Sequence, residues 1–157
     1  MKKKTWRVHL GVTHTPYAYV EFKRSHEHAA GYTVVLVDVK RLMGCFERDQ
    51  LVIGRPTEWT ETKREGIRQF LDPKEGACEM PVVGFSIRTR THRRLLGFAT
   101  PRIEKVPVAG FTNGRHRARY LQYAGAKVMP VEVHEAEAAL LRERCGASGH
   151  GSECEVR

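Results

Sequence analysis

Four cationic or ionisable side chains lie together in one short segment, directly after a glycine. Arg115, His116, Arg117 and Arg119 follow Gly114, at the point where the pattern predicts that a helix begins. A helix N-terminus presents backbone N–H groups without partners and a partial positive charge. Guanidinium groups added there suit a phosphate group or another oxyanion. The segment therefore predicts a phosphate-binding turn.

The residues on either side predict the elements that hold this turn. The range 106–133 reads as a strand, a glycine turn, a helix, a glycine stop and a second strand. Thr112 or Asn113 can cap the helix with a side-chain oxygen. Gly114 relaxes the backbone before the helix, and Gly125 stops the helix one residue past its last turn. We therefore expect the cationic residues in the first turn of a short helix between two strands.

Arg117 differs from its neighbours in the side of the helix on which it falls. At helical spacing it shares a stripe with Leu121 and Ala124, which is the apolar, inward side. Helical side chains lean toward the helix N-terminus, so we expect Arg117 to reach back over the glycine turn. The alternative is an arginine whose stem packs and whose head extends to solvent. The cationic neighbours favour the phosphate role.

A lysine on a second predicted helix extends the site. This helix follows Pro56, is capped by Thr57 and runs to Leu71. Lys63 lies in the middle of its apolar stripe, where a charge is out of place for a surface helix. Snorkelling of the lysine to solvent is the competing interpretation. The residues of the stripe are Trp59, Ile67, Phe70 and Leu71.

The net charge of +9 is concentrated in one part of the chain. Between residues 86 and 120, eight arginines and Lys105 face one acid, Glu104, so this window carries +8 and the other 122 residues carry +1. This concentration favours a face that binds a polyanion over a merely solvated surface. The residues expected to contact nucleic acid are Arg88, Arg90, Arg93, Arg94 and Arg119.

Part of this charge lies on a predicted pair of strands. The ranges 80–90 and 95–100 read as strands joined by a basic turn. Arg88, Arg90 and His92 alternate, so all three project from one face. Such a row can follow the backbone of a nucleic acid.

The turn and its flanks resemble the signature of the ParB/sulfiredoxin superfamily, which includes the ParB-like nuclease domains. That signature is a glycine-rich turn ending in His-Arg or Arg-Arg, a short helix, and a strand that opens with proline. Here these parts are Asn113 to Arg117, Ala124-Gly125 and Met129-Pro130-Val131. The match is close over 111–133 and looser back to about residue 34.

The resemblance implies an α+β fold, namely a single ParB/sulfiredoxin-like domain with a mixed sheet and a few short helices. We expect this domain to span residues 1–146, with its core over 34–146 and an N-terminal β extension of strands over 5–33. Residues 147–157 are rich in glycine and serine, and we expect a flexible tail there.

One residue separates this chain from the sulfiredoxins. Those enzymes place their reactive cysteine immediately before the His-Arg pair, where this chain has Arg115. Without a thiolate, sulfinyl-phosphate repair of peroxiredoxins is excluded, whereas the cradle for nucleotide phosphates is retained. In sulfiredoxin-like proteins a lysine on the matching helix helps to hold the phosphates. The resemblance assigns that role to Lys63, beside Arg117 and the Gly114 turn.

Within the superfamily, the range 110–117 looks most like the small plasmid fertility inhibition proteins of the Osa/FiwA kind. This resemblance implies a protein that blocks transfer of a competing conjugative plasmid or T-DNA through a type IV secretion system. Such proteins are associated with DNase and ATPase activities. We therefore expect a nuclease and ATPase that binds DNA and uses ATP or another nucleotide, with magnesium as a candidate ion. The coupling ATPase of the secretion channel is a candidate partner.

The expected chemistry is attack by water on a phosphoryl group whose developing charge is neutralised by cationic side chains. Arg117 and Lys63 would clamp the phosphate, and Arg115 would contact the substrate strand. His116 is the expected acid or base, because an imidazole titrates near working pH. The expected catalytic residues are His116 and Arg117. The expected phosphate-binding residues are Lys63, Thr112, Asn113, Gly114, Arg115 and Arg117.

Two other kinds of function stay open. One is a non-catalytic DNA-binding module, like the N-terminal domain of a partition protein. The other is an inhibitor that docks on the coupling ATPase without chemistry of its own. No metal ligand is assigned, because Asp38, Glu58 and Glu61 are no more than candidate carboxylates for a divalent ion.

The remaining features point to the interior of the cell. The four cysteines lack the spacing of a disulfide framework. No run approaches the ~20 apolar residues of a membrane span. We therefore expect a cytoplasmic protein without a membrane span. His26-Glu27-His28 is expected to be an exposed loop without a metal.

Overall fold

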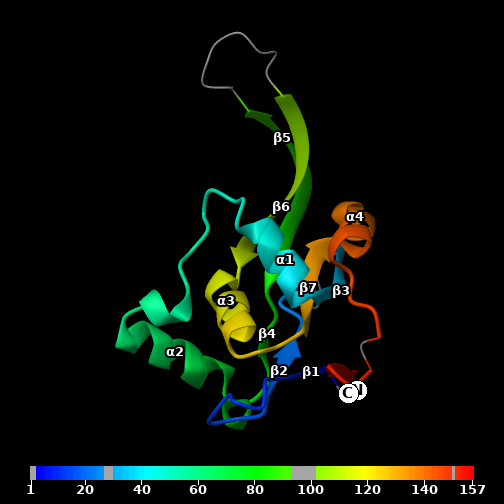
Figure 1. Cartoon of the computed structure of the whole chain (residues 1–157). Coiled ribbons are helices and arrows are strands. Elements are labelled where there is room, and N and C mark those ends of the chain that lie inside the picture. The colour runs from blue at the N-terminus through cyan, green and yellow to red at the C-terminus, as the bar shows by residue number, and fades with distance from the viewer. Residues whose placement is uncertain (1–2, 27–29, 93–101, 150) are drawn as a thin grey trace.

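The central sheet carries much of the core on valine-rich strands. Its strands, in order, are β3 (Tyr32–Asp38), β7 (Val128–His134), β5 (Val82–His92) and β6 (Arg102–Asn113). All pairs are antiparallel except that of β7 with β5. Every residue from Val128 to Val133 is buried, so β7 lies at the centre of the core (Figure 1). The computed structural model describes residues 3–26, 30–92, 102–149 and 151–157.

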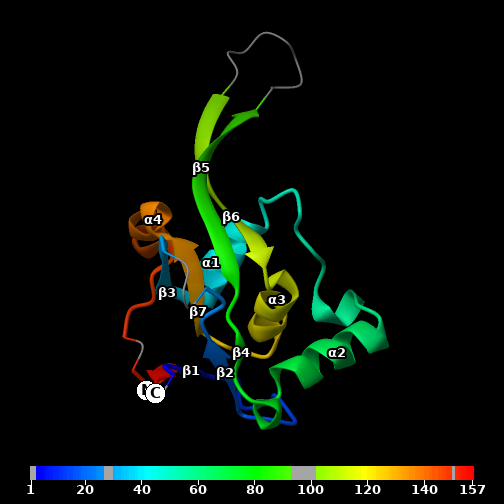
Figure 2. The same cartoon turned by 180° about the vertical axis from the view of Figure 1, so that it is seen from behind.

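The N-terminal strands belong to a second sheet. Its strands, in order, are β4 (Cys78–Glu79), β2 (Tyr19–Lys23), β1 (Trp6–His9) and β8 (Cys154–Val156). Only the pair of β2 with β4 is parallel. The expected flexible tail over 147–157 is thus replaced by a strand at its end, because Cys154 is buried there and Val156 lies opposite Trp6. The two chain ends consequently lie side by side (Figures 1 and 2).

The part of the chain that the structure describes contains four α-helices. These are α1 (Val39–Phe46), α2 (Glu61–Leu71), α3 (Arg115–Tyr123) and α4 (Glu135–Cys145), with 3₁₀ turns at Pro56–Glu58 and Pro73–Glu75. The helix predicted after the glycine turn is confirmed, and Gly125 follows it with a positive φ of 85°. Helix α2 begins later than predicted. Its cap is Thr60, whose hydroxyl accepts from the Lys63 N–H (3.3 Å), and not Thr57.

Strands β5 and β6 extend beyond the sheet as a two-stranded ribbon. β5 pairs with β7 only through Val82 and Val83, and from residue 84 to 92 it pairs with β6 alone. The base of the ribbon packs on α1 and α4. Its exposed end, residues 88–92 and 102–105, projects away from the helices and both sheets (Figures 1 and 2). It is the basic strand pair that the sequence predicts. Its second strand begins at Arg102, and the strand expected over 95–100 lies outside the described residues.

Together these elements form a single α+β domain, as predicted, with two mixed sheets where one was expected. Helix α3 lies between α2 and the central sheet (Figures 1 and 2). This arrangement places the turn before α3 beside α2. None of the described helices is long and apolar enough to cross a lipid bilayer.

Candidate phosphate-binding site

Gly114 forms the turn between β6 and α3, and no other residue fits there without strain. Its backbone is left-handed, with φ 85° and ψ 16°, a conformation that L side chains rarely adopt. A Cβ atom at this position would lie 2.9 Å from Cα of Pro81 and 3.1 Å from Nη2 of Arg117. The turn is therefore pressed against Pro81, and Arg117 lies directly over it.

Helix α3 begins without a side-chain cap. Gly114 is its N-cap residue, so the cap predicted at Thr112 or Asn113 is wrong. The side-chain oxygen of Asn113 instead accepts a hydrogen bond from Nη2 of Arg117 (2.8 Å). The first backbone N–H groups of a helix have no intrahelical acceptor, and glycine offers them no side-chain oxygen. These N–H groups are the donors that an anion at the turn would meet.

Arg117 reaches back over the turn, as its place on the helix predicts. It is 6% exposed, and its Nη1 donates to the carbonyl oxygen of Glu79. The guanidinium carbon lies 5.4 Å from the ring centre of Phe70. Burial lowers the pKa of Arg117 from its usual value, but a guanidinium stays charged in proteins. The bonds to Glu79 and Asn113 use two of its five N–H donors, so the others can bind a phosphate.

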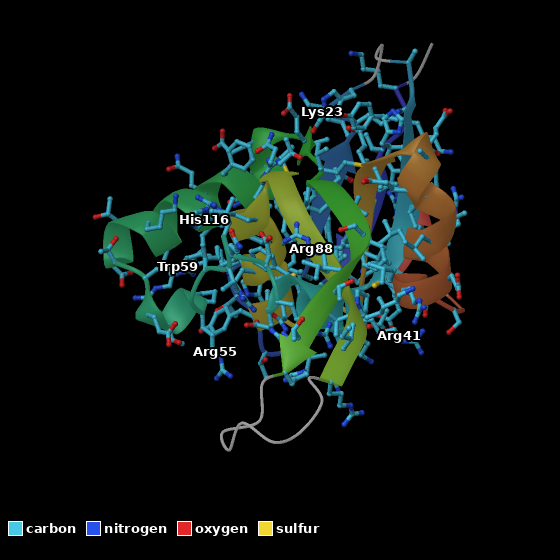
Figure 3. The ribbon with its side chains drawn as sticks, turned by 90° about the horizontal axis from the view of Figure 1, so that it is seen from above. Lys23, Arg41, Arg55, Trp59, Arg88 and His116 are labelled. Carbon is cyan, nitrogen blue, oxygen red and sulfur yellow. The ribbon has the colours of Figure 1, made fainter. Side chains whose placement is uncertain are left out.

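His116 lies beside Trp59 at the same turn (Figure 3). The two ring centres are 5.3 Å apart, with the planes at 65°. The pKa of His116 is lowered by partial burial first, and then by the positive charges of Lys63 and Arg115. The lowered pKa favours the neutral imidazole, which is the form that can accept a proton.

A pocket of about 490 Å³ lies over the turn. Residues 111–117 form one side of it, and Leu51, Ile67 and Phe70 supply an apolar side. Its volume falls within the ~300–1,000 Å³ typical of small-ligand sites. The structure thus brings together in one pocket most of the predicted phosphate-binding and catalytic residues, namely Thr112, Asn113, Gly114, Arg115, His116 and Arg117.

Sequence reasoning missed the apolar wall of this pocket. Leu51 and Phe70 are large apolar residues that are 61% and 50% exposed. Phe70 appears in the sequence as part of the packing stripe of α2, and Leu51 lies in a loop without periodicity. No local signal marks either residue as part of a site, because their meeting depends on how α2 packs.

Lys63 lies close to this pocket without lining it. The side chain is exposed on α2, and its charge is near enough to lower the pKa of His116. Its role as a second phosphate clamp stays a prediction.

Arg119 is a buried structural residue, although the sequence suggests a contact with nucleic acid. It is 4% exposed, and its Nη1 pairs with Oε1 of Glu47 (2.5 Å). Its Nη2 donates to the carbonyl oxygen of Ile53 (2.9 Å). These bonds tie α3 to the segment after α1. The guanidinium is therefore buried among these contacts.

The other predicted nucleic-acid contacts lie on the ribbon. Arg88 and Arg90 are exposed on β5, and Nη1 of Arg88 lies 3.9 Å from Oδ1 of Asp49. Arg88 does not line the pocket over the Gly114 turn. Arg93 and Arg94 lie outside the described residues.

The candidate metal carboxylates have local structural roles. Asp38 caps α1, and Glu58 accepts a hydrogen bond from the N–H of Arg55 (2.8 Å). Glu61 pairs with Arg64, one turn along α2. No group of three or more His, Cys, Asp or Glu that could hold a metal occurs among the described residues.

A buried carboxylate also escaped sequence reasoning. Glu132 in β7 is fully buried, and its oxygens bind Nε of Arg24 (2.8 Å) and Nδ1 of His26 (3.0 Å). The backbone N–H groups of Ser25 and His26 donate to it as well. The sequence feature that could have revealed Glu132 is an acid inside an otherwise apolar predicted strand. The cluster fastens the segment after β2 to the central sheet.

Comparison with known proteins identifies the family of this chain. The family model described as PFIN, plasmid fertility inhibition factor, matches residues 34–146. The chain belongs to this family. The match begins in β3 and ends just after α4, so it contains the Gly114 turn and the ribbon. It also confirms the closer resemblance noted in the sequence.

A solved structure shows the same fold. It is the crystal structure of the Oncogenic Suppression Activity Protein, a plasmid fertility inhibition factor, as a gold(I) cyanide derivative. The TM-score is 0.63 at 16% identity, over 92% of this chain and 70% of that chain. At this identity the likeness concerns the fold alone. A search of curated proteins finds no match.

Proposed function

We propose that this fertility inhibition factor binds nucleotide and DNA phosphates, and that it blocks conjugative or T-DNA transfer by ATP-linked DNA degradation. The observation that carries the proposal is the pocket at the Gly114 turn. There, uncapped backbone N–H groups, two guanidinium groups and a neutral imidazole line one volume of about 490 Å³. An oxyanion is the ligand that such a set of donors suits.

His116 accepts a proton from the attacking water in this mechanism. The water oxygen forms a bond to phosphorus, the bond from phosphorus to the leaving oxygen breaks, and the proton passes to the imidazole. Arg115 and Arg117 neutralise the charge that develops on the phosphoryl oxygens. Arg117 is well placed for this, because Glu79 and Asn113 hold its guanidinium over the turn before any ligand arrives.

Magnesium would reach this site with the nucleotide. The described residues include no group of three metal-ligating side chains, and magnesium is commonly held by substrate phosphates and water with few protein ligands. When bound, it would neutralise phosphate charge, which is the task of the arginines as well.

The test is phosphate release from ATP and decay of linear DNA by the purified protein, with and without magnesium. Arg115→Ala should weaken ATP binding about tenfold, because it removes about one hydrogen bond between charged groups. His116→Ala should abolish turnover while ATP still binds. Lys74→Ala, on the 3₁₀ turn Pro73–Glu75, is the control of equal charge. If both site variants turn over ATP and DNA at the wild-type rates, the proposal is wrong.

A further inference from the structure

The β5–β6 ribbon has two chemically different faces. Opposite residues of an antiparallel pair point to the same side, and successive residues along each strand alternate. The register is Arg88 with Val106, Arg90 with Glu104, and His92 with Arg102. The arginine face, as we call it, carries the charged and titratable residues Arg88, Arg90, His92, Arg102 and Glu104. The opposite face carries Ile87, Thr89, Thr91, Ile103 and Lys105.

Positive charge on the arginine face is only partly neutralised. Three arginines share this face with one acid, Glu104, which already binds Nε2 of His92 (2.9 Å). Among the described residues, Arg90 and Arg102 make no hydrogen bond or ion pair. Arg88 lies at the long distance of 3.9 Å from the carboxylate of Asp49. The guanidinium groups on this face are therefore available to an external anion.

The shape of the ribbon limits what that anion can be. From residue 84 outward, the two strands pair only with each other, and their exposed end, residues 88–92 and 102–105, projects from the body (Figures 1 and 2). A two-stranded β ribbon is one of the two elements that the major groove of DNA admits, because this groove is about 12 Å wide. We infer that the ribbon enters the major groove of double-stranded DNA with its arginine face toward the duplex.

A duplex suits the ribbon better than a single strand. Proteins that bind single strands stack the bases on aromatic side chains. The exposed end of the ribbon, residues 88–92 and 102–105, contains no Phe, Tyr or Trp, and Phe85 at its base is buried. Arginine serves duplex recognition directly, since it binds phosphates and the guanine edge in the major groove. The inference rests on the proposed function, in which DNA is a substrate, and names the form of DNA and the surface that holds it.

The experiment measures fluorescence anisotropy of a labelled duplex of about two helical turns, ~20 base pairs, with EDTA present to suppress cleavage. Arg88→Ala/Arg90→Ala should weaken duplex binding at least about tenfold at near-physiological salt. The slope of log K against log salt should also fall by about 1.8, because each lost phosphate contact removes about 0.9. A major-groove ligand such as methyl green should compete, whereas netropsin, which binds the minor groove, should not.

Two matched variants separate position from charge. Lys23→Ala/Lys74→Ala removes the same charge from exposed sites outside the ribbon and should leave the affinity close to that of the wild type. Ile103→Thr alters the opposite face and should also bind as the wild type. Circular dichroism checks that each variant is folded.

Several results count against the inference. They are tighter binding of a single strand of the same length, equal binding of poly-glutamate, or wild-type duplex affinity in Arg88→Ala/Arg90→Ala. If the double variant binds DNA normally while His116→Ala has lost ATP turnover, the ribbon inference alone fails. If His116→Ala keeps its turnover while the double variant loses the duplex, the ribbon inference stands and the proposed chemistry fails.

Discussion

The side-chain oxygen of Asn113 accepts a hydrogen bond from Nη2 of Arg117, four residues further along the chain, at 2.8 Å. The amide therefore serves the guanidinium and does not cap helix α3. With the carbonyl of Glu79 on Nη1, it holds the side chain over Gly114. The arginine is thus positioned before a ligand binds, which reduces the entropy that binding would cost.

Asn113→Ala should weaken ATP binding about fivefold to tenfold while leaving the fold intact. The variant removes the hydrogen bond from Arg117 to Asn113, at a position where the Asn113 side chain is exposed. A hydrogen bond to a charged group contributes at most ~1.5–3 kcal/mol. Isothermal titration measures the affinity, and Lys74→Ala, which changes an exposed residue outside the pocket, is the control. Equal affinities for Asn113→Ala and the wild type would show that the amide does not position Arg117.

The pH dependence of phosphate release should report His116. Burial, Lys63 and Arg115 lower its pKa, and a general base acts in its neutral form. The rate should therefore hold as the pH falls to the usual histidine value of ~6.5 and decline only below it. Lys63→Ala removes one of the charges that lower the pKa, so the decline should move to higher pH. Lys63→Arg keeps the charge and should leave the profile in place. A profile that Lys63→Ala does not move would contradict this assignment of the base.

Gly114→Ala should destabilise the protein and disrupt the pocket. The left-handed backbone disfavours a side chain by ~1–2 kcal/mol, and the new Cβ would lie 2.9 Å from Cα of Pro81. The matched control is Gly66→Ala within α2, where a Cβ meets nothing within 4 Å. That change should stabilise the protein by ~0.5–1 kcal/mol. Urea unfolding measures both, and a loss of stability in the control would show that helix propensity is not the dominant effect there.

Arg119→Ala should lower the free energy of unfolding by about 1–3 kcal/mol, because it leaves the carbonyl of Ile53 without its donor. DNA affinity should be unchanged in the fraction that is folded. The control for stability is Arg90→Ala, which removes an exposed arginine of the ribbon and should change the free energy of unfolding by no more than about 0.5 kcal/mol. Chemical denaturation compares the two, and equal stability of both variants would contradict a structural role for Arg119.

Several features of this protein follow from local sequence. The order of strand, glycine turn, helix and strand around Gly114 depends on backbone geometry and apolar spacing within a few residues, and the structure confirms it. The inward direction of Arg117 follows from helical periodicity alone. The range 110–117 suggests the family, and the family model that matches 34–146 confirms it.

Other features were decided by partners distant in the chain. Arg117 and Arg119 stand two residues apart, and both are buried, yet the partners of Arg119 are Glu47 and Ile53, in a loop that the sequence leaves without periodicity. The C-terminal strand exists because β1 offers it a pairing edge. Leu51 joins the pocket only because of how the loop and α2 pack around α3. Periodicity and turn chemistry act over a few residues, whereas burial of a charge depends on where its distant acceptors lie, and only the tertiary structure determines that.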